Sequence, residues 1–88
     1  VLTAKVMDYR LRVRSKPSLR GRIVGHLPKG AEVLILKKSK KMKIRLGRRY
    51  NTGYWYKISW EKTDDTTSRS TKVIGWVWGK YLTFSTND

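Results

Sequence analysis

The sequence predicts a small all-β barrel of five to six short strands. Apolar and polar residues alternate along several segments, Pro and Gly interrupt those segments at short intervals, and no stretch has the periodicity of an amphipathic helix. A chain of 88 residues is expected to form a single domain, residues 1–88. Closure into a barrel suits so small a domain, because it removes exposed strand edges.

The first expected strand covers residues 10–14. Arg occupies every second position there, with Leu11 and Val13 between, so that one face of the strand is cationic and the other apolar. Pro17 and its small neighbours interrupt the pattern and predict a first long loop. Apolar residues resume over 23–27, which we interpret as the second strand.

The middle of the chain combines the best candidate for a central strand with its most basic segment. Residues 28–30, Pro-Lys-Gly, predict a tight turn into the apolar run 33–36. Residues 37–53 are expected to form a second long loop, in which the alternating Met42, Ile44 and Leu46 could make a frayed strand extension. Eight basic residues and no acidic one stand between 37 and 49: Lys37, Lys38, Lys40, Lys41, Lys43, Arg45, Arg48 and Arg49.

The remaining segments predict three more strands. Residues 54–60 are aromatic and β-prone, whereas the polar stretch 61–72 is expected to be a hairpin loop. Residues 73–77 predict another strand, followed by a short turn over 79–82 and a closing strand at 83–84.

Positive charge is the strongest feature of the composition. The chain has 21 Lys and Arg residues against 6 Asp and Glu, a net charge of +15. Such an excess repels itself and indicates an anionic partner, which could be nucleic acid, a membrane face or an acidic polymer of the cell envelope. Burial of the four Trp, five Tyr and one Phe is expected to offset the repulsion.

Other features narrow the class of protein. No apolar run approaches the roughly 18 residues of a membrane-spanning helix, and no signal peptide opens the sequence. The absence of Cys excludes disulfides and thiolate metal sites. Because the sequence begins with Val1, we expect a domain that belongs to a longer protein.

Residues suited to catalysis or metal binding are scarce. His26 is the only His, and no Cys stands elsewhere to complete a metal site with it, so we interpret it as a turn residue. The adjacent Asp64 and Asp65 lie among Thr and Ser, which indicates a solvated turn rather than a cation site. No phosphate-binding Gly loop is present. We therefore predict no enzyme, no catalytic residue, no metal and no cofactor.

Three segments together resemble the bacterial Src-homology-3 (SH3b) domain. The first is residues 11–18, Leu-Arg-Val-Arg-Ser-Lys-Pro-Ser, and the second is residues 23–30, Ile-Val-Gly-His-Leu-Pro-Lys-Gly, with the apolar run after it. The third combines Trp-Tyr-Lys-Ile at 55–58, Gly-Trp-Val at 75–77 and Tyr-Leu at 81–82. The resemblance covers roughly residues 4–83 and implies an SH3-like barrel with long first and second loops.

In such a barrel, Gly30 and Gly75 are expected where a side chain would obstruct the turn or the strand. The expected core residues are Leu11, Val13, Val33, Ile35, Ile58 and Val77.

The resemblance also implies a shallow groove for extended peptides, with basic residues beside it. Trp55 and Trp78 are the strongest candidates for exposed groove residues, whereas Trp76 and Tyr56 are at least as well explained by core packing. The expected groove aromatics are Tyr9, Tyr54, Trp55, Trp76, Trp78 and Tyr81. The expected basic flanks are Arg10, Arg12, Arg14, Lys16, Lys38, Lys40, Lys41, Arg48 and Arg49.

These expectations favour a non-catalytic binding module of a bacterial cell-envelope or secreted protein. Its ligand would be a cell-wall peptide or another anionic envelope component, and the resemblance implies an extracytoplasmic location and a monomer. Two alternatives remain open: a protein-interaction or spacer domain within a lipoprotein, and a basic barrel that binds nucleic acid through phosphates and stacked bases.

Overall fold

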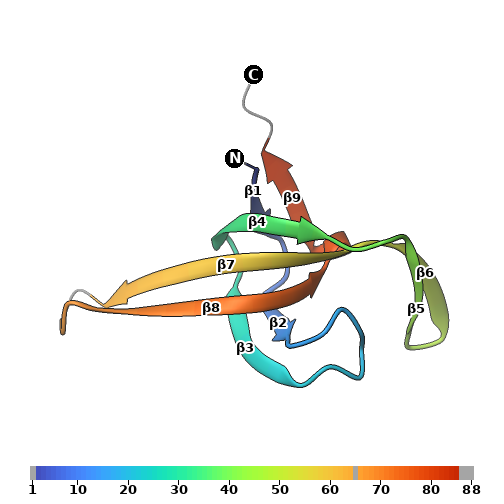
Figure 1. Cartoon of the computed structure of the whole chain (residues 1–88), viewed down its shortest axis with the longest axis horizontal. Coiled ribbons are helices and arrows are strands. Elements are labelled where there is room, and N and C mark those ends of the chain that lie inside the picture. The colour runs from blue at the N-terminus through green and yellow to red at the C-terminus, as the bar shows by residue number, and fades with distance from the viewer. Residues whose placement is uncertain (1, 65, 86–88) are drawn as a thin grey trace.

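The computed structural model describes residues 2–64 and 66–85, which form an all-β fold. Seven strands make one antiparallel sheet in the order β3-β2-β8-β7-β4-β1-β9, while β5 and β6 pair only with each other. The large sheet curls into a half-barrel (Figure 1). The elements are β1 (Thr3–Val6), β2 (Arg10–Arg14), β3 (Ile23–Pro28), β4 (Glu32–Lys38), β5 (Met42–Leu46), β6 (Arg49–Gly53), β7 (Trp55–Asp64), β8 (Arg69–Trp78), the 3-10 helix η1 (Gly79–Tyr81) and β9 (Leu82–Ser85).

The main core lies inside the curl of the sheet. Five of the six predicted core residues belong to it, and Ile35 packs against it while partly exposed. The apolar run 33–36 does form a strand between β7 and β1, but Leu34 and Leu36 face solvent, because only one face of β4 points inward. The buried residues of the core are Ala4, Val6, Leu11, Val13, Leu27, Val33, Ile58, Val77 and Leu82.

Two glycines occupy positions that other residues would not tolerate well. A Cβ at Gly75 would lie 2.6 Å from Val13 Cγ1 and 2.7 Å from the carbonyl oxygen of Arg14, so the approach of β2 to β8 requires Gly. Gly30 has φ +88° in the turn between β3 and β4, a conformation that L-residues with a side chain rarely adopt.

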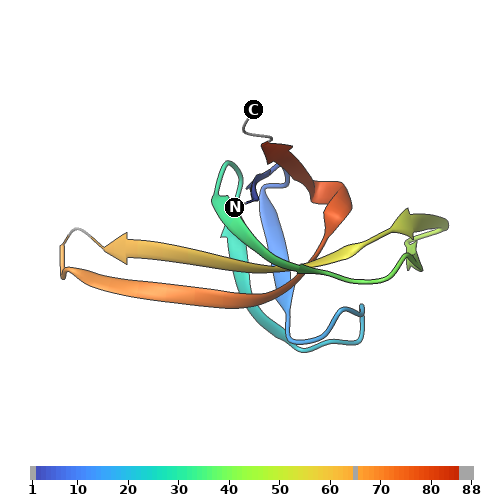
Figure 2. The same ribbon diagram turned by 45° about the horizontal axis from the view of Figure 1, so that its top comes forward.

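The prediction of a hairpin loop over 61–72 is wrong. β7 and β8 remain paired from Trp55↔Trp78 to Asp64↔Arg69, and form a long ribbon that projects from the barrel (Figure 2). Thr and Ser suit an exposed strand as well as a loop, which explains the error. Asp65 lies outside the described residues, and Asp64 ends β7.

The prediction of a long loop over 37–53 is also wrong. β5 and β6 form a hairpin with register Met42↔Gly53 to Leu46↔Arg49, closed at Gly47, which has φ +65°. The alternation of Met42, Ile44 and Leu46 marks β5 correctly, although the basic residues between them made a solvated loop the favoured interpretation.

The remaining differences are smaller. With β1 and the β5–β6 hairpin, the described residues contain nine strands, more than the five to six predicted. The turn expected over 79–82 contains η1, and His26 is an exposed residue of β3 rather than of a turn.

Candidate functional site

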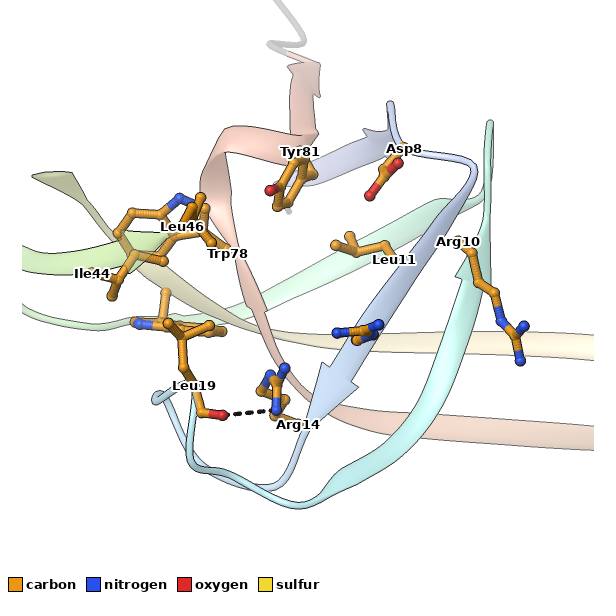
Figure 3. A pocket seen from close by; sticks show the side chains of 11 residues that line it. Asp8, Arg10, Leu11, Arg14, Leu19, Ile44, Leu46, Trp78 and Tyr81 are labelled. Atoms are coloured by element: carbon orange, nitrogen blue, oxygen red, sulfur yellow. Dashed lines mark hydrogen bonds between the residues drawn. The ribbon is translucent and has the colours of Figure 1, made fainter. Parts of the chain in front are cut away.

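A pocket of about 240 Å³ opens between β2, the loop 15–22, β5 and η1. Figure 3 shows Asp8 and Tyr81 at one end of the pocket and Arg14 with Leu19 at the other. Its lining combines aromatic and aliphatic side chains with three Arg and one Asp. Concave sites that join an apolar surface to a few polar groups are the usual ligand sites of proteins.

The aromatic wall is a buried pair of Trp side chains. Trp55 and Trp78 are directly opposite each other on β7 and β8, and their ring centroids lie 5.3 Å apart at an interplanar angle of 64°. Ile44 of β5 packs against the pair and leaves Trp55 2% and Trp78 4% exposed. The prediction that these two Trp are the exposed ones is therefore wrong: β5–β6 covers them, and only part of each ring faces the pocket.

Both indoles hold a polar atom without a partner. Nε1 of Trp55 and Nε1 of Trp78 are buried and make no hydrogen bond. A buried N–H without an acceptor costs about 1 to 3 kcal/mol, and such groups in a native protein call for a physical explanation. Here the explanation is packing. The two rings are buried beneath the hairpin, and burial of the rings also buries their N–H groups.

The opposite wall is cationic. Arg10, Arg12 and Arg14 alternate along β2. Arg14 Nη1 donates to the carbonyl oxygen of Leu19 at 2.9 Å (Figure 3) and to that of Gly21 at 3.0 Å. These bonds hold the loop 15–22 against the strand.

The guanidinium groups of Arg10 and Arg12 have no hydrogen-bonding or ionic partner among residues 2–64 and 66–85, so they are available to a ligand. Figure 3 shows that the Arg10 side chain lies at the rim and extends away from the aromatic wall. Guanidinium groups bind carboxylates or phosphates in bidentate fashion.

Asp8 adds the one acidic group of the pocket. Its Oδ1 accepts a hydrogen bond from the backbone N–H of Tyr9 at 2.8 Å, which leaves further acceptor capacity on the carboxylate. The pocket therefore presents the guanidinium groups of Arg10 and Arg12, the carboxylate of Asp8 and the aromatic wall. This combination suits an extended chain that carries both a carboxylate and an amine.

Of the predicted site residues, six line this pocket: Trp55, Trp78, Tyr81, Arg10, Arg12 and Arg14. The others lie elsewhere. Trp76 is half-buried beside the Trp pair without lining the pocket, Tyr9 is 79% exposed beneath Lys29, and Lys16 is an exposed residue of the loop 15–22. Five further predicted flanks, which stand around the β5–β6 hairpin, do not line the pocket either: Lys38, Lys40, Lys41, Arg48 and Arg49.

Tyr54 lines a second pocket, of about 380 Å³, on the other side of Trp78. Tyr54 and Phe84 flank Tyr56, with ring centroids 6.4 Å and 4.9 Å from it, and Lys38 Nζ lies 3.9 Å from the Tyr54 ring centroid. Lys80 Nζ donates to Asn51 Oδ1 at 3.4 Å at its edge. Tyr54 thus lies in a different pocket from Trp55 and Tyr81, and Trp78 lines both pockets.

The sequence prediction did not assign five residues of the first pocket to the site: Leu11, which it placed in the core, and Asp8, Leu19, Ile44 and Leu46. The alternation of Ile44 and Leu46 was the available signal, because it indicates a strand with one buried face. Asp8 and Leu19 carry no local signal, since only the fold brings them to the pocket.

Two further properties bear on function. Within the part of the chain that the structure describes, no group of three His, Cys, Asp or Glu residues could hold a metal ion. No helix of that part is long and apolar enough to cross a membrane.

Comparison with known families identifies the fold. The model of the bacterial SH3 domain family matches residues 10–83, and the chain belongs to this family. No curated protein and no solved structure matches the chain. Domains of this family are in general non-catalytic modules that bind peptides or proteins, and this chain is accordingly a binding module.

Proposed function

We propose that this chain is a non-catalytic module that binds a short, extended cell-wall peptide in the pocket between β2 and β5. The observation that carries the proposal is the pairing of two uncommitted Arg with a rigid aromatic wall in one pocket. The location that follows is the cell envelope or its exterior, with this chain acting as part of a larger protein.

The ligand's chemistry follows from the groups that line the pocket. Apolar parts of the peptide would lie against Tyr81 and the exposed Leu19, while the buried Trp55 and Trp78 keep the wall of the pocket rigid. A peptide carboxylate would pair with Arg12, or with Arg10 at the rim, and an amine would pair with Asp8, which lies beside Tyr81 at one end of the pocket (Figure 3). Peptides of bacterial cell walls carry both groups.

Calorimetry tests the proposal. The chain is titrated with a synthetic cell-wall peptide, here called the stem peptide, and separately with the same peptide whose carboxylates are amidated. A charge-assisted hydrogen bond is worth about 1.5 to 3 kcal/mol, so Arg12→Gln should weaken binding of the acid form tenfold or more. It should hardly change binding of the amidated form. Arg22→Gln removes an exposed cation outside the pocket and serves as the matched control.

Two results would contradict the proposal. Equal losses of affinity for the acid form of the peptide in Arg12→Gln and Arg22→Gln would mean that overall charge alone attracts the peptide. No binding of either peptide by the unaltered chain would favour a spacer or protein-interaction domain instead.

A further inference from the structure

The β5–β6 hairpin and its approach form the most cationic surface of the molecule. Between Glu32 and Glu61 the sequence has no acidic residue, and eight cations stand between positions 37 and 49. All eight are exposed. Figure 1 shows the hairpin projecting on the side opposite to the tip of the β7–β8 ribbon, so nothing in the large sheet covers its outward face.

One face of the hairpin packs against the barrel and the other faces solvent. Met42, Ile44 and Leu46 point toward the Trp pair, which anchors the hairpin to the barrel. Lys43 and Arg45 alternate with them and therefore point away. Their cross-strand partners Thr52 and Tyr50 share that outward face, as directly opposed residues do.

The cations of this surface are not neutralised. Arg45 Nε donates to the Gly47 carbonyl at 3.0 Å, and Lys43 Nζ lies 4.9 Å from the ring centroid of Tyr50. Among the described residues none of the eight forms an ion pair with a carboxylate. Like charges held together by a rigid hairpin repel one another, and an anionic partner would relieve that repulsion.

We propose that the outward face of the β5–β6 hairpin is a docking surface for a bilayer of anionic phospholipid. The inference is independent of the peptide pocket, because the outward residues Lys43, Arg45 and Tyr50 do not line it. Lys43 and Arg45 lie on this face, Arg48 lies in the turn of the hairpin, and Lys37, Lys38, Lys40 and Lys41 lie on its approach, whereas Arg49 is paired with Leu46 of the packed face. Clusters of four to eight Lys or Arg are typical of surfaces that bind anionic headgroups. The exposed Tyr50, at 62%, places an amphipathic ring where headgroups would lie.

A bilayer fits this face better than nucleic acid does. Sequence-tolerant nucleic-acid sites stack successive bases on several aromatic rings, whereas the outward face of the hairpin carries Tyr50 as its single ring among the described residues. Five of the eight cations are Lys, whose long flexible stems suit a fluid array of phosphates.

Sedimentation with lipid vesicles tests the proposal directly. The vesicles contain phosphatidylglycerol and phosphatidylcholine in equal parts, or phosphatidylcholine alone. The hairpin variant replaces Lys40, Lys41, Lys43 and Arg48 by Gln. The control variant replaces four exposed cations elsewhere, Lys5, Lys62, Arg69 and Lys72, by Gln. Each variant lowers the net charge by four, from +15 to +11.

The unaltered chain should bind the anionic vesicles and not the neutral ones, and binding should weaken with salt. Each cation near an anionic surface contributes roughly fivefold to partitioning. The hairpin variant should therefore bind at least about fiftyfold more weakly, and the control should stay within about threefold of the unaltered chain. Tyr50→Ala should weaken binding about threefold, because this exposed ring would be lost from the interface without disturbing the core.

Tryptophan fluorescence, to which the buried pair contributes two of the four Trp, verifies that each variant is folded. Binding of the stem peptide should be unchanged in the hairpin variant. Three results would overturn the inference. The first is absence of binding of the unaltered chain to the anionic vesicles, and the second is an equal loss of vesicle affinity in the hairpin variant and the control variant. The third is tighter binding of a duplex oligonucleotide than of the anionic vesicles at the same ionic strength.

Discussion

Trp55 and Trp78 meet edge to face across β7 and β8, 5.3 Å apart between ring centroids, and Ile44 of the β5–β6 hairpin closes over them. This pair joins the hairpin to the barrel. The same two rings form the aromatic wall of the pocket, so the stability of the hairpin and the shape of the pocket depend on one cluster.

Ile44→Ala should loosen the hairpin from the barrel. Removal of a buried aliphatic side chain leaves a cavity and typically costs 2 to 5 kcal/mol, and we expect about 2 kcal/mol here because the cluster is small. Lys43→Ala, one position away on the exposed face, should change the free energy of unfolding by less than about 0.5 kcal/mol. Urea denaturation measures the free energy of unfolding of both variants. Equal changes in Ile44→Ala and Lys43→Ala would show that Ile44 does not face the Trp pair.

Trp78→Phe should be tolerated far better than Trp78→Ala. The Phe variant loses ring area but also removes an Nε1 donor that is buried without a partner, and these effects oppose each other. We expect a loss of about 1 kcal/mol for Phe against 3 to 5 kcal/mol for Ala. If the Phe variant were as unstable as the Ala variant in thermal denaturation, the indole N–H would have a partner after all.

The barrel core could be predicted from the sequence because its signal is local. Leu11 and Val13 alternate with Arg along β2, and that alternation alone places them inside. The burial of Trp55 could not be predicted in this way. It depends on Ile44 of β5, a strand that pairs only with β6 and whose Lys and Arg residues favoured the interpretation of a solvated loop. Asp8 could not be predicted for a similar reason, since only the curl of the sheet places it at the end of the pocket beside Tyr81 (Figure 3).

Gly75→Ala should be among the most damaging single-methyl changes in the chain. The added Cβ would meet both Val13 and the backbone of Arg14 at less than 3 Å, and backbone atoms cannot move aside cheaply. We expect a loss of about 2 to 3 kcal/mol from overpacking. Gly47→Ala is the matched control, because a Cβ there meets nothing within 4 Å and only the φ of +65° is unfavourable, at about 1 kcal/mol. Equal losses in chemical denaturation would contradict the close approach of β2 and β8.

Arg14→Gln should free the loop 15–22 without unfolding the barrel. The two hydrogen bonds from Arg14 Nη1 to Leu19 and Gly21 fix this loop at the edge of the pocket. Hydrogen bonds from a charged donor contribute about 1.5 to 3 kcal/mol, so amide hydrogens within the loop should exchange tenfold faster or more. Arg12→Gln removes an equal charge from the same strand but no contact to the loop, and it should leave exchange unchanged. Peptide affinity should fall in both variants, in Arg14→Gln through the loosened wall of the pocket and in Arg12→Gln through the lost cation. Slow exchange in Arg14→Gln would instead show that the backbone bonds of the loop, such as Ser15 N–H to the Arg22 carbonyl at 2.8 Å, are sufficient to hold it.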